Sequence, residues 1–253
     1  MEEHKELFVT NVGSHMWGMN RPDSDVDLFV VYQAPSTHFL IGKAHTHSHR
    51  SMNGNIDKVS FELGHVINQL LKGNINFLWG VMSPIIIKNW DRLQTLRELT
   101  IKNLSKQLYH SVHGLGLHNY KKYIESGKDP TSKRCTMICR SLNFGTKLLT
   151  TGKLNFDPIK PCTPADVLRH IHALDLAYVT SSLPESPEYT REMETWLLDV
   201  RLHKLKEEHP SLFYVRLTLI KRKGGSLSNC HRDLFFQAFY EEPHPVPVAS
   251  VFP

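Results

Sequence analysis

The chain has 253 residues, 40% of them hydrophobic and 22% charged, with a formal net charge of +5. This composition allows a sizeable core, in one large or two small domains, and excludes a collagen, a low-complexity chain and a globally disordered one. No run of eighteen apolar residues is present, so we expect no membrane span, and the charged N-terminus predicts no secretory signal and a cytoplasmic protein. The mild basic excess is compatible with a nucleotide or nucleic-acid partner.

The first hundred residues read mainly as strands separated by turns. The apolar run from Leu7 to Val9 predicts a strand that enters a tight turn at Gly13. A second strand is expected from Val26 to Tyr32 and a third from Ile56 to Ser60. The stretch between these two strands, residues 33–55, contains a proline, two glycines and a run of histidines, so we expect a loop or lid there.

A helix should follow the third strand, because apolar residues recur at the i, i+3, i+4, i+7 and i+8 positions of one helix face. These residues are Leu63, Val66, Ile67, Leu70 and Leu71. Gly73 and Asn74 predict the end of this helix. With a further β-prone run at residues 84–87, the pattern predicts an α+β domain over residues 1–94.

Helical spacing dominates residues 95–207 and predicts an all-helical second domain. A helix start is expected at Thr163–Asp166, where a cap residue, a proline and an acid follow in order, and another at Ser186–Glu188. Gly152 is expected to end the helix before the first of these starts. The tail, residues 208–253, predicts neither a fold nor a function.

The four cysteines bear on the redox compartment and on metal binding. They are Cys135, Cys139, Cys162 and Cys230, and no two of them form a CxxC pair, which argues against a zinc ribbon. Cys135 and Cys139 are four residues apart in a helical stretch and therefore share a face. We expect buried free thiols in a reducing compartment.

The segment with the clearest chemistry runs from Gly13 to Leu28. Gly13 allows a sharp turn and a close approach of the backbone to a ligand, and Ser14 can open a short helix whose free N–H groups face phosphate. Asp25 and Asp27 are two apart on a strand, so both carboxylates point to one face. Two carboxylates beside a phosphate-binding turn predict a site for Mg²⁺ or Mn²⁺.

This arrangement resembles the signature of the DNA-polymerase-β nucleotidyltransferase superfamily: Gly-Ser, ten residues, then Asp-hydrophobic-Asp-hydrophobic. The resemblance implies a third metal-binding acid on a later strand, which Asp57 matches in Ile56-Asp57-Lys58-Val59. It also implies that Asp25 and Asp27 bind two metals, and that Asp57 binds one of them and helps to deprotonate the acceptor. Gly13 and Ser14 would cradle the β- and γ-phosphates of an NTP.

Within that superfamily, the chain is most similar to the members found beside RNA ligases in RNA-repair gene clusters. The third acid, Glu62, an apolar helix and Gly73-Asn74 follow in the same order as in that family. The helical region matches it at Lys133, Arg140 and Gly152. The chain departs from it at Trp79, where the family carries glutamate, and at Ile75, where it carries proline; both departures concern acceptor specificity.

The choice of Asp57 over Glu62 as the third ligand also has a physical basis. The two acids are five apart, so on a continuous strand they point to opposite faces. Glu62 sits where the apolar helix begins, and an acid there offsets the positive end of the helix dipole. Asp57 has no such duty and lies in a β-prone run where aspartate is disfavoured.

Two further groups have open interpretations. We expect the active site in a cleft between the two domains. Lys133 and Arg140 are seven apart, two helical turns, so they face the same way. They would bind the triphosphate or an RNA backbone if that face meets the cleft, and otherwise form a solvated face. His45, His47, His49 and Arg50 form His-Thr-His-Ser-His-Arg, which is an exposed polar loop, a contact to phosphate or RNA, or a transition-metal site.

The sequence therefore predicts a metal-dependent enzyme that transfers a nucleoside monophosphate from an NTP to an acceptor hydroxyl and releases pyrophosphate. An RNA end, such as that of a tRNA, is the acceptor that the resemblance implies. Nucleotidylylation of a small molecule or protein and a catalytically silent RNA-binding module stay as alternatives, although three intact acids argue against the silent form. The preferred NTP and the oligomeric state are left open.

Overall fold

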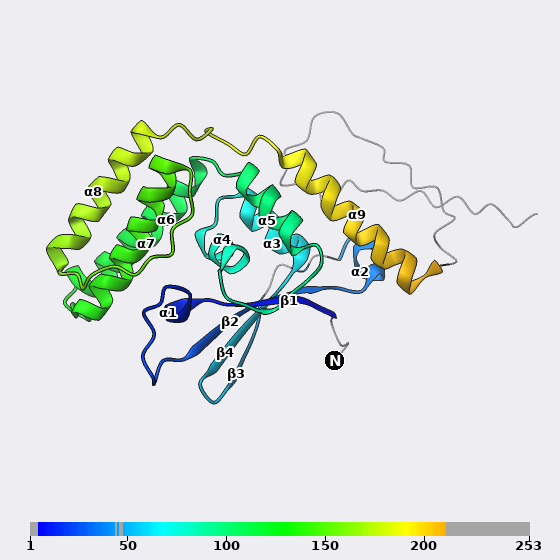
Figure 1. Ribbon diagram of the computed structural model, residues 1–253, viewed down its shortest axis with the longest axis horizontal. Coiled ribbons are helices and arrows are strands. Elements are labelled where there is room, and N and C mark those ends of the chain that lie inside the picture. Colours follow the sequence, from blue (N-terminus) through cyan, green and yellow to red (C-terminus); the bar gives the residue numbers. More distant parts are fainter. Residues whose placement is uncertain (1–4, 44, 46–47, 211–253) are drawn as a thin grey trace, which may run out of the picture. The chain divides into compact units, whose positions relative to one another are not determined.

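The computed structural model describes residues 5–43, 45 and 48–210 of the chain (Figure 1). The chain divides into two compact units, one of residues 1–34 and 45–197 and the other of residues 35–44 and 198–253. The first unit contains the sheet and most of the helices. The boundaries expected from the sequence, near residues 94 and 207, stay a prediction.

The sheet of the first unit has five strands in the order β3-β4-β2-β1-β5. Their bounds are Lys5–Asn11 for β1, Val26–Gln33 for β2, His49–Asn53 for β3, Ile56–Glu62 for β4 and Ile86–Lys88 for β5. β2 and β4 are parallel, and the other neighbouring pairs are antiparallel. The strands predicted from the sequence are confirmed.

The prediction of a loop over residues 33–55 is wrong in part. Ser36–Leu40 forms the short helix α2, and His49–Asn53 forms β3, which pairs with β4 through a two-residue turn at Gly54 and Asn55. Gly54 has a φ of 58°, as such a turn requires. Every residue of β3 is exposed, so the strand lacks the apolar alternation by which a half-buried strand is recognised.

Two helices of the first unit pack on the sheet. α3, Leu63–Leu71, contacts β2 and β4, and α4, Ile75–Met82, contacts β1. The predicted stop after α3 is confirmed at Gly73, which has a φ of 68°. At the departure from the family pattern, the Ile75 N–H donates a 3.0 Å hydrogen bond to Ser111 Oγ, which a proline could not do.

The region after the sheet is helical, as predicted. It contains α5 (Leu93–Lys102), α6 (Gln107–Asn119), the π-helical turn η1 (Tyr120–Glu125), α7 (Ser132–Thr151), α8 (Pro164–Thr180) and α9 (Thr190–Glu208). α6, α7 and α8 pack against one another, as Figure 1 shows. In the part of the chain that the structure describes, no helix combines the length and the apolar character that crossing a membrane requires.

Two of the three predicted helix boundaries in this region are confirmed. Thr163 and Asp166 form a capping box at the start of α8, and α7 ends at Gly152 in the left-handed conformation. The start predicted at Ser186 is wrong, because α9 begins at Thr190. The Tyr189 N–H donates to Asn103 Oδ1 at 3.1 Å, so the preceding segment docks on the α5–α6 connection instead of continuing the helix.

An aromatic cluster joins the N-terminal segment to α7. Trp17, which directly follows the short helix α1 (Gly13–Met16), is 2% exposed. Its ring lies 5.7 Å from Trp79 and from Phe144 and 5.2 Å from Phe156, measured between centroids. This packing fixes the turn at Gly13 against the helix that carries Lys133 and Arg140.

In the second unit, α2 contacts the end of α9. The Ser36 N–H donates to Glu208 Oε2 at 2.8 Å, and the Arg201 guanidinium lies 5.8 Å from the centre of the Phe39 ring. The tail of uncertain structure expected over residues 208–253 lies, from residue 211 onward, outside the described residues.

Candidate active site

The sheet register brings two of the predicted acids together. β2 and β4 pair in parallel with Asp27 opposite Asp57, so both side chains leave the same face of the sheet. Asp25 lies two residues before Asp27, immediately ahead of β2. Burial raises the pKa of Asp27, and the negative charges of Asp57 and Asp25 raise it further, with His15 and Arg50 opposing. The three carboxylates therefore converge and repel one another.

Gly13 is required at its position for two reasons. Its φ is 64°, a conformation that other residues rarely adopt, and a Cβ atom placed on it would lie 1.9 Å from Asp27 Oδ2. The Val12 N–H donates to the Asp27 carbonyl at 2.8 Å and holds the turn against β2. The sequence predicted that the backbone at Gly13 approaches a ligand closely. The structure shows that it closely approaches the carboxylate of Asp27.

Asp57 has a cationic partner that sequence reasoning missed. Arg50 on β3 pairs with Val59, two residues beyond Asp57, so the side chains of Arg50 and Asp57 share a face. Arg50 Nε donates to Asp57 Oδ1 at 2.8 Å, and Arg50 Nη2 donates to Oδ2. This hydrogen bonding holds the pKa of Asp57 below its ordinary value. The sequence grouped Arg50 with the histidines of an expected loop, so it gave no reason to pair Arg50 with Asp57.

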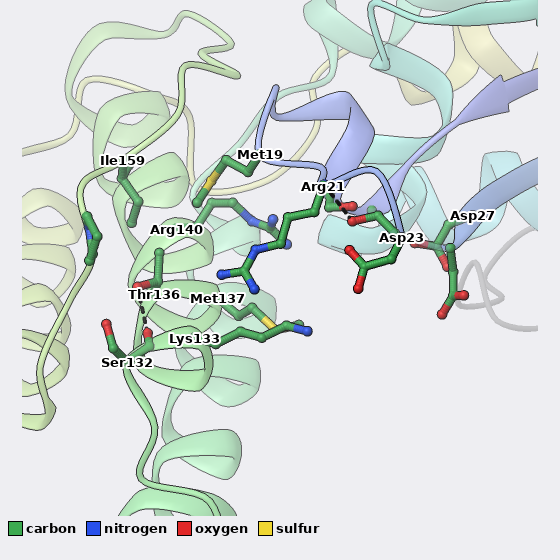
Figure 2. A pocket seen from close by; sticks show the side chains of 15 residues that line it. Met19, Arg21, Asp23, Asp27, Ser132, Lys133, Thr136, Met137, Arg140 and Ile159 are labelled. Carbon is green, nitrogen blue, oxygen red and sulfur yellow. Dashed lines mark hydrogen bonds between the residues drawn. The ribbon is translucent and has the colours of Figure 1, made fainter. Parts of the chain in front are cut away.

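A charged cavity of about 520 Å³ opens beside Asp25 and Asp27. Gly13 and Ser14 line it from the turn, and Lys133 and Arg140 line it from α7, so the predicted common face of those two cations does meet a cavity. Figure 2 shows their side chains and that of Arg21 extending into one hollow, with Asp23 and Asp27 across from them.

Arg21 was not predicted as a site residue. Its N–H donates to Ser24 Oγ at 2.7 Å and its carbonyl accepts from the Ser24 N–H at 3.0 Å, which fixes the turn that precedes Asp25. The turn could be read from Pro22, but the direction of the arginine side chain depends on where α7 packs.

Arg140 is the least solvated cation of this cavity. Its guanidinium lies 5.0 Å from the centre of the Trp17 ring, and burial lowers its pKa to about 10 against the opposing effect of Asp27. Its Nε atom is buried and has no hydrogen-bond partner among the described residues. A cation with an unused donor at the edge of a cavity favours an anionic ligand such as a phosphate.

A second cavity, of about 350 Å³, is also lined by Asp27 and is largely apolar, with several aromatic rings, so we call it the aromatic cavity. Its aromatic lining comes from β2, β4, α4 and the residue after α1: Phe29, Phe61, Phe77, Trp79 and Trp17. Asp57 lines this aromatic cavity, Asp25 lines the charged one, and Asp27, Gly13 and Arg140 line both. Trp79, one of the two departures from the family pattern, thus borders the cavity next to Asp57.

Glu62 lies at the start of α3, as its place in the sequence suggested. Its side chain is the cap of the helix: Glu62 Oε2 accepts from the Gly64 N–H at 2.6 Å and from the His65 N–H at 3.3 Å. The residue is 5% exposed. Among the histidines of the predicted loop, His49 belongs to β3, its ring 6.0 Å from that of Tyr32, and His47 lies outside the described residues.

An α+β sheet with convergent acids on neighbouring parallel strands and a Gly-Ser turn beside them defines a nucleotidyltransferase of the polymerase-β kind. Residues 1–178 match the RNA repair pathway DNA polymerase beta family, RlaP, and the chain belongs to that family. The family resemblance inferred from the sequence is confirmed.

The chain is also similar to an uncharacterized protein of Methanocaldococcus jannaschii, MJ0002, with 26% identity over 155 residues. This match covers 60% of the chain and 63% of the relative, less than two thirds of the relative's length. A crystal structure of a nucleotidyltransferase-like protein from Exiguobacterium sibiricum aligns with 88% of the chain and 91% of its own, at 11% identity and a TM-score of 0.29.

Proposed function

We propose that the chain transfers a nucleoside monophosphate from an NTP to an acceptor hydroxyl, with release of pyrophosphate, in a metal-dependent reaction. One observation carries the proposal: Asp25, Asp27 and Asp57 converge at the junction of a cation-lined cavity and an aromatic cavity. Such a junction provides a place for a phosphate chain on one side and an acceptor on the other.

The donor set fits a hard divalent cation. Three carboxylates supply oxygen ligands, which Mg²⁺ and Mn²⁺ prefer. The pKa of Asp27 is raised by burial and then by the negative charges of Asp57 and Asp25, which a cation would offset. We propose that Asp25 and Asp27 hold the metal ions, and that Asp57 joins them when Arg50 releases one of its oxygens. Bound there, the metal supplies charge stabilisation for the phosphoryl oxygens.

In the proposed reaction the charged cavity takes the triphosphate. Lys133 and Arg140 bind its phosphate oxygens, while Gly13 and Ser14 cradle the β- and γ-phosphates. The α-phosphorus then lies next to Asp27. The acceptor oxygen forms a bond to this phosphorus as the bond to the β-phosphate oxygen breaks, and the pyrophosphate carries the electron pair away.

The acceptor approaches from the aromatic side. Asp57 lines that cavity, and a carboxylate oxygen that Arg50 releases can receive the proton of the acceptor hydroxyl. Phe61, Phe77 and Trp79 offer ring surfaces on which a terminal base can stack. This lining and the RNA-repair family support an RNA end, for example of a tRNA, as the acceptor.

The test is incubation of the purified chain with each of the four labelled NTPs, Mg²⁺ or Mn²⁺ and total RNA, followed by a denaturing gel. We expect label in RNA with one preferred NTP, and none with Asp25→Asn or Asp27→Asn. Label on the protein or on a small molecule would replace RNA as the acceptor, and no transfer with any acceptor would reject the enzyme. RNA binding should weaken steeply with salt if several phosphates are contacted.

A further inference from the structure

A cluster of thiols and an imidazole lies outside the carboxylate site, in the helical region. Cys139 on α7, Cys162 before α8 and His170 on α8 each offer one ligand atom, and the three atoms lie within 4.8 Å of one another. Both cysteines are buried and unoxidised, and His170 is half-buried. We propose that these three residues form a structural zinc site, which does not depend on the proposed nucleotidyl transfer.

The donor chemistry selects zinc over the cations of the acid site. Thiolate sulfur and imidazole nitrogen are ligands of tetrahedral Zn²⁺, at bond lengths of about 2.3 and 2.0 Å. Ligand atoms on such an ion lie about 3.5 Å apart, so the three side chains need to close by only about 1 Å. Binding releases the two thiol protons to solvent, and the imidazole binds through an unprotonated nitrogen.

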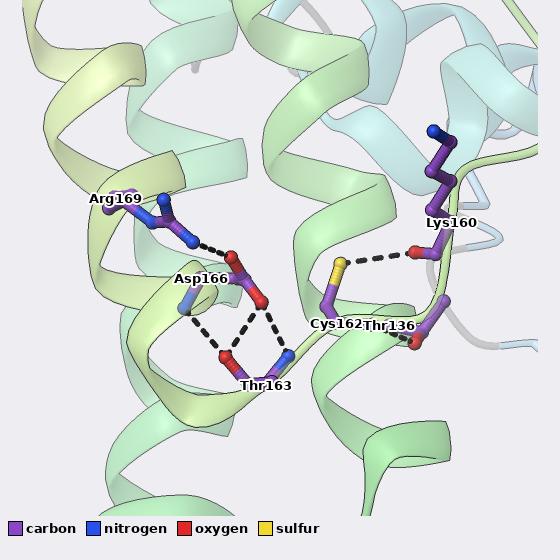
Figure 3. A network of polar contacts seen from close by, with 6 residues as sticks. All are labelled: Thr136, Lys160, Cys162, Thr163, Asp166 and Arg169. Carbon is purple, nitrogen blue, oxygen red and sulfur yellow. Dashed lines mark hydrogen bonds and ion pairs between the residues drawn. The ribbon is translucent and has the colours of Figure 1, made fainter.

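The surrounding residues favour Cys135 over Asp166 as a fourth ligand. The Asp166 carboxylate accepts from the Thr163 N–H and hydroxyl and from Arg169, as Figure 3 shows, and is committed to the helix cap. Cys135 lies one turn before Cys139 on the same face of α7, is also buried and carries a free thiol. Its thiol is not among the three atoms that lie within 4.8 Å of one another, so its side chain would have to turn toward them to become the fourth ligand.

The proposed zinc would fix a wall of the charged cavity. The connection from α7 to α8 is anchored near Cys162 by two hydrogen bonds: the Cys162 N–H donates to Thr136 Oγ1 at 2.9 Å, and its thiol, a weak donor, donates to the Lys160 carbonyl at 3.3 Å. Ile159, Pro161 and Thr136 all line the cavity. A zinc ion would replace the thiol contact with bonds to two helices and hold this connection in place.

The experiment uses the full chain purified without chelators, with zinc measured by mass spectrometry. We expect one zinc per chain, lost in Cys139→Ser, Cys162→Ser and His170→Ala. Two matched controls should keep it: Cys230→Ser, which changes the remaining cysteine, and Asp25→Asn, which changes the acid site. Zinc retained in the three ligand variants, or lost from a control, would place the ion elsewhere and overturn the proposal.

A second measurement does not depend on variants that fold. Wild-type protein stripped with a chelator and titrated with Co²⁺ should show the absorption of tetrahedral thiolate coordination, which Zn²⁺ then removes, and Zn²⁺ should raise its melting temperature. Failure of Co²⁺ to give this spectrum would overturn the proposal. So would a disulfide between Cys139 and Cys162, found by peptide mapping without reduction, in protein that holds no metal.

Discussion

The two cavities that meet at Asp27 differ in the chemistry they offer. The charged cavity has Asp25 at its edge and the cations Arg21, Lys133 and Arg140 in its lining, whereas the aromatic cavity has Asp57 at its edge and rings in its lining. In the proposed reaction one sheet face would serve two substrates, because Asp57 on β4 lines one cavity and Asp25, just ahead of β2, lines the other. Substitutions on the two sides should therefore change different kinetic constants.

The largest effect is expected where the cavities join. Asp27→Asn keeps the shape of the side chain but removes the charge that the proposed metals need, so turnover should fall about thousandfold, and Asp25→Asn and Asp57→Ala should fall comparably. Glu62→Ala is the matched acid: it removes a helix cap, costs about 1 kcal/mol of stability and leaves turnover largely intact. Single-turnover rates and melting temperatures of all four variants decide this. More than roughly a tenth of wild-type turnover in Asp27→Asn would reject the metal-dependent mechanism.

Gly13→Ala should have the next largest effect, since its Cβ would collide with Asp27 Oδ2 and displace the carboxylate. Misplacement of about 1 Å at a reacting centre costs about a hundredfold in rate. Gly18→Ala is the control, because Gly18 has a similar φ of 61° and no atom within 4 Å of its added Cβ. Equal losses of activity in the two variants would trace the effect to backbone strain and not to Asp27.

One substitution in each cavity tests whether the two cavities bind different substrates. Lys133→Ala should raise the KM for the NTP about tenfold with little change for the acceptor, because it removes a cation from the charged cavity. Trp79→Ala should raise the KM for an RNA acceptor about tenfold with little change for the NTP. Trp79→Phe keeps a ring that can stack on a base and pack on Trp17 and Phe144, so it should restore most of the KM for the RNA acceptor. If both variants change the same constant, the division between the cavities is wrong.

The part of this arrangement that sequence could predict is the part set by local rules. The strand period of two places Asp25 and Asp27 on one face of a strand, and the helical period places Lys133 and Arg140 on one face of a helix. Both results are independent of the surrounding residues. The register that sets Asp27 beside Asp57, and the packing that aims α7 at the acids, are tertiary. The family resemblance could therefore name Asp57, but strand spacing alone could not.

What escaped prediction lacked a local signal. Arg50 sits on a strand exposed along its whole length, so no alternation marked it. Arg21 begins a turn, and the direction of its side chain depends on the tertiary fold. Cys139, Cys162 and His170 come from three segments without a zinc spacing, so the sequence indicated only buried thiols, which the structure confirms for the described cysteines.

A smaller effect is expected at the ion pair on the aromatic side. Arg50→Gln frees both oxygens of Asp57, so Mn²⁺ should bind with a roughly two- to fivefold lower apparent Kd, as expected from loss of a competing pair that is partly solvated. Titration of Mn²⁺ by electron paramagnetic resonance measures this. Lys58 follows Asp57 on β4 and pairs with Glu6 on β1, so Lys58→Gln, which breaks that pair, serves as the control. Weaker Mn²⁺ binding in Arg50→Gln would show that the arginine supports the site and does not compete with the metal.

The smallest effect concerns stability, and its sign follows from the charge at the junction. The pKa of Asp27 in the folded protein is raised above its ordinary value of 3.8, first by burial and then by Asp57 and Asp25. A carboxyl group whose pKa is raised by folding contributes stability below its unfolded pKa and loses that contribution as the pH rises through the folded pKa.

At neutral pH without metal, Asp27→Asn should therefore melt about 1–2 °C above wild type, a small gain because solvent reaches part of the carboxylate. The gain should shrink as the pH falls toward 3.8, and Mg²⁺ should raise the melting temperature of wild type but not of the variant. Scanning calorimetry at several pH values, with and without Mg²⁺, measures both. A variant less stable than wild type at neutral pH without metal would mean that Asp27 is held by attraction and not crowded by the other acids, and the junction would then have no excess negative charge for a metal to offset.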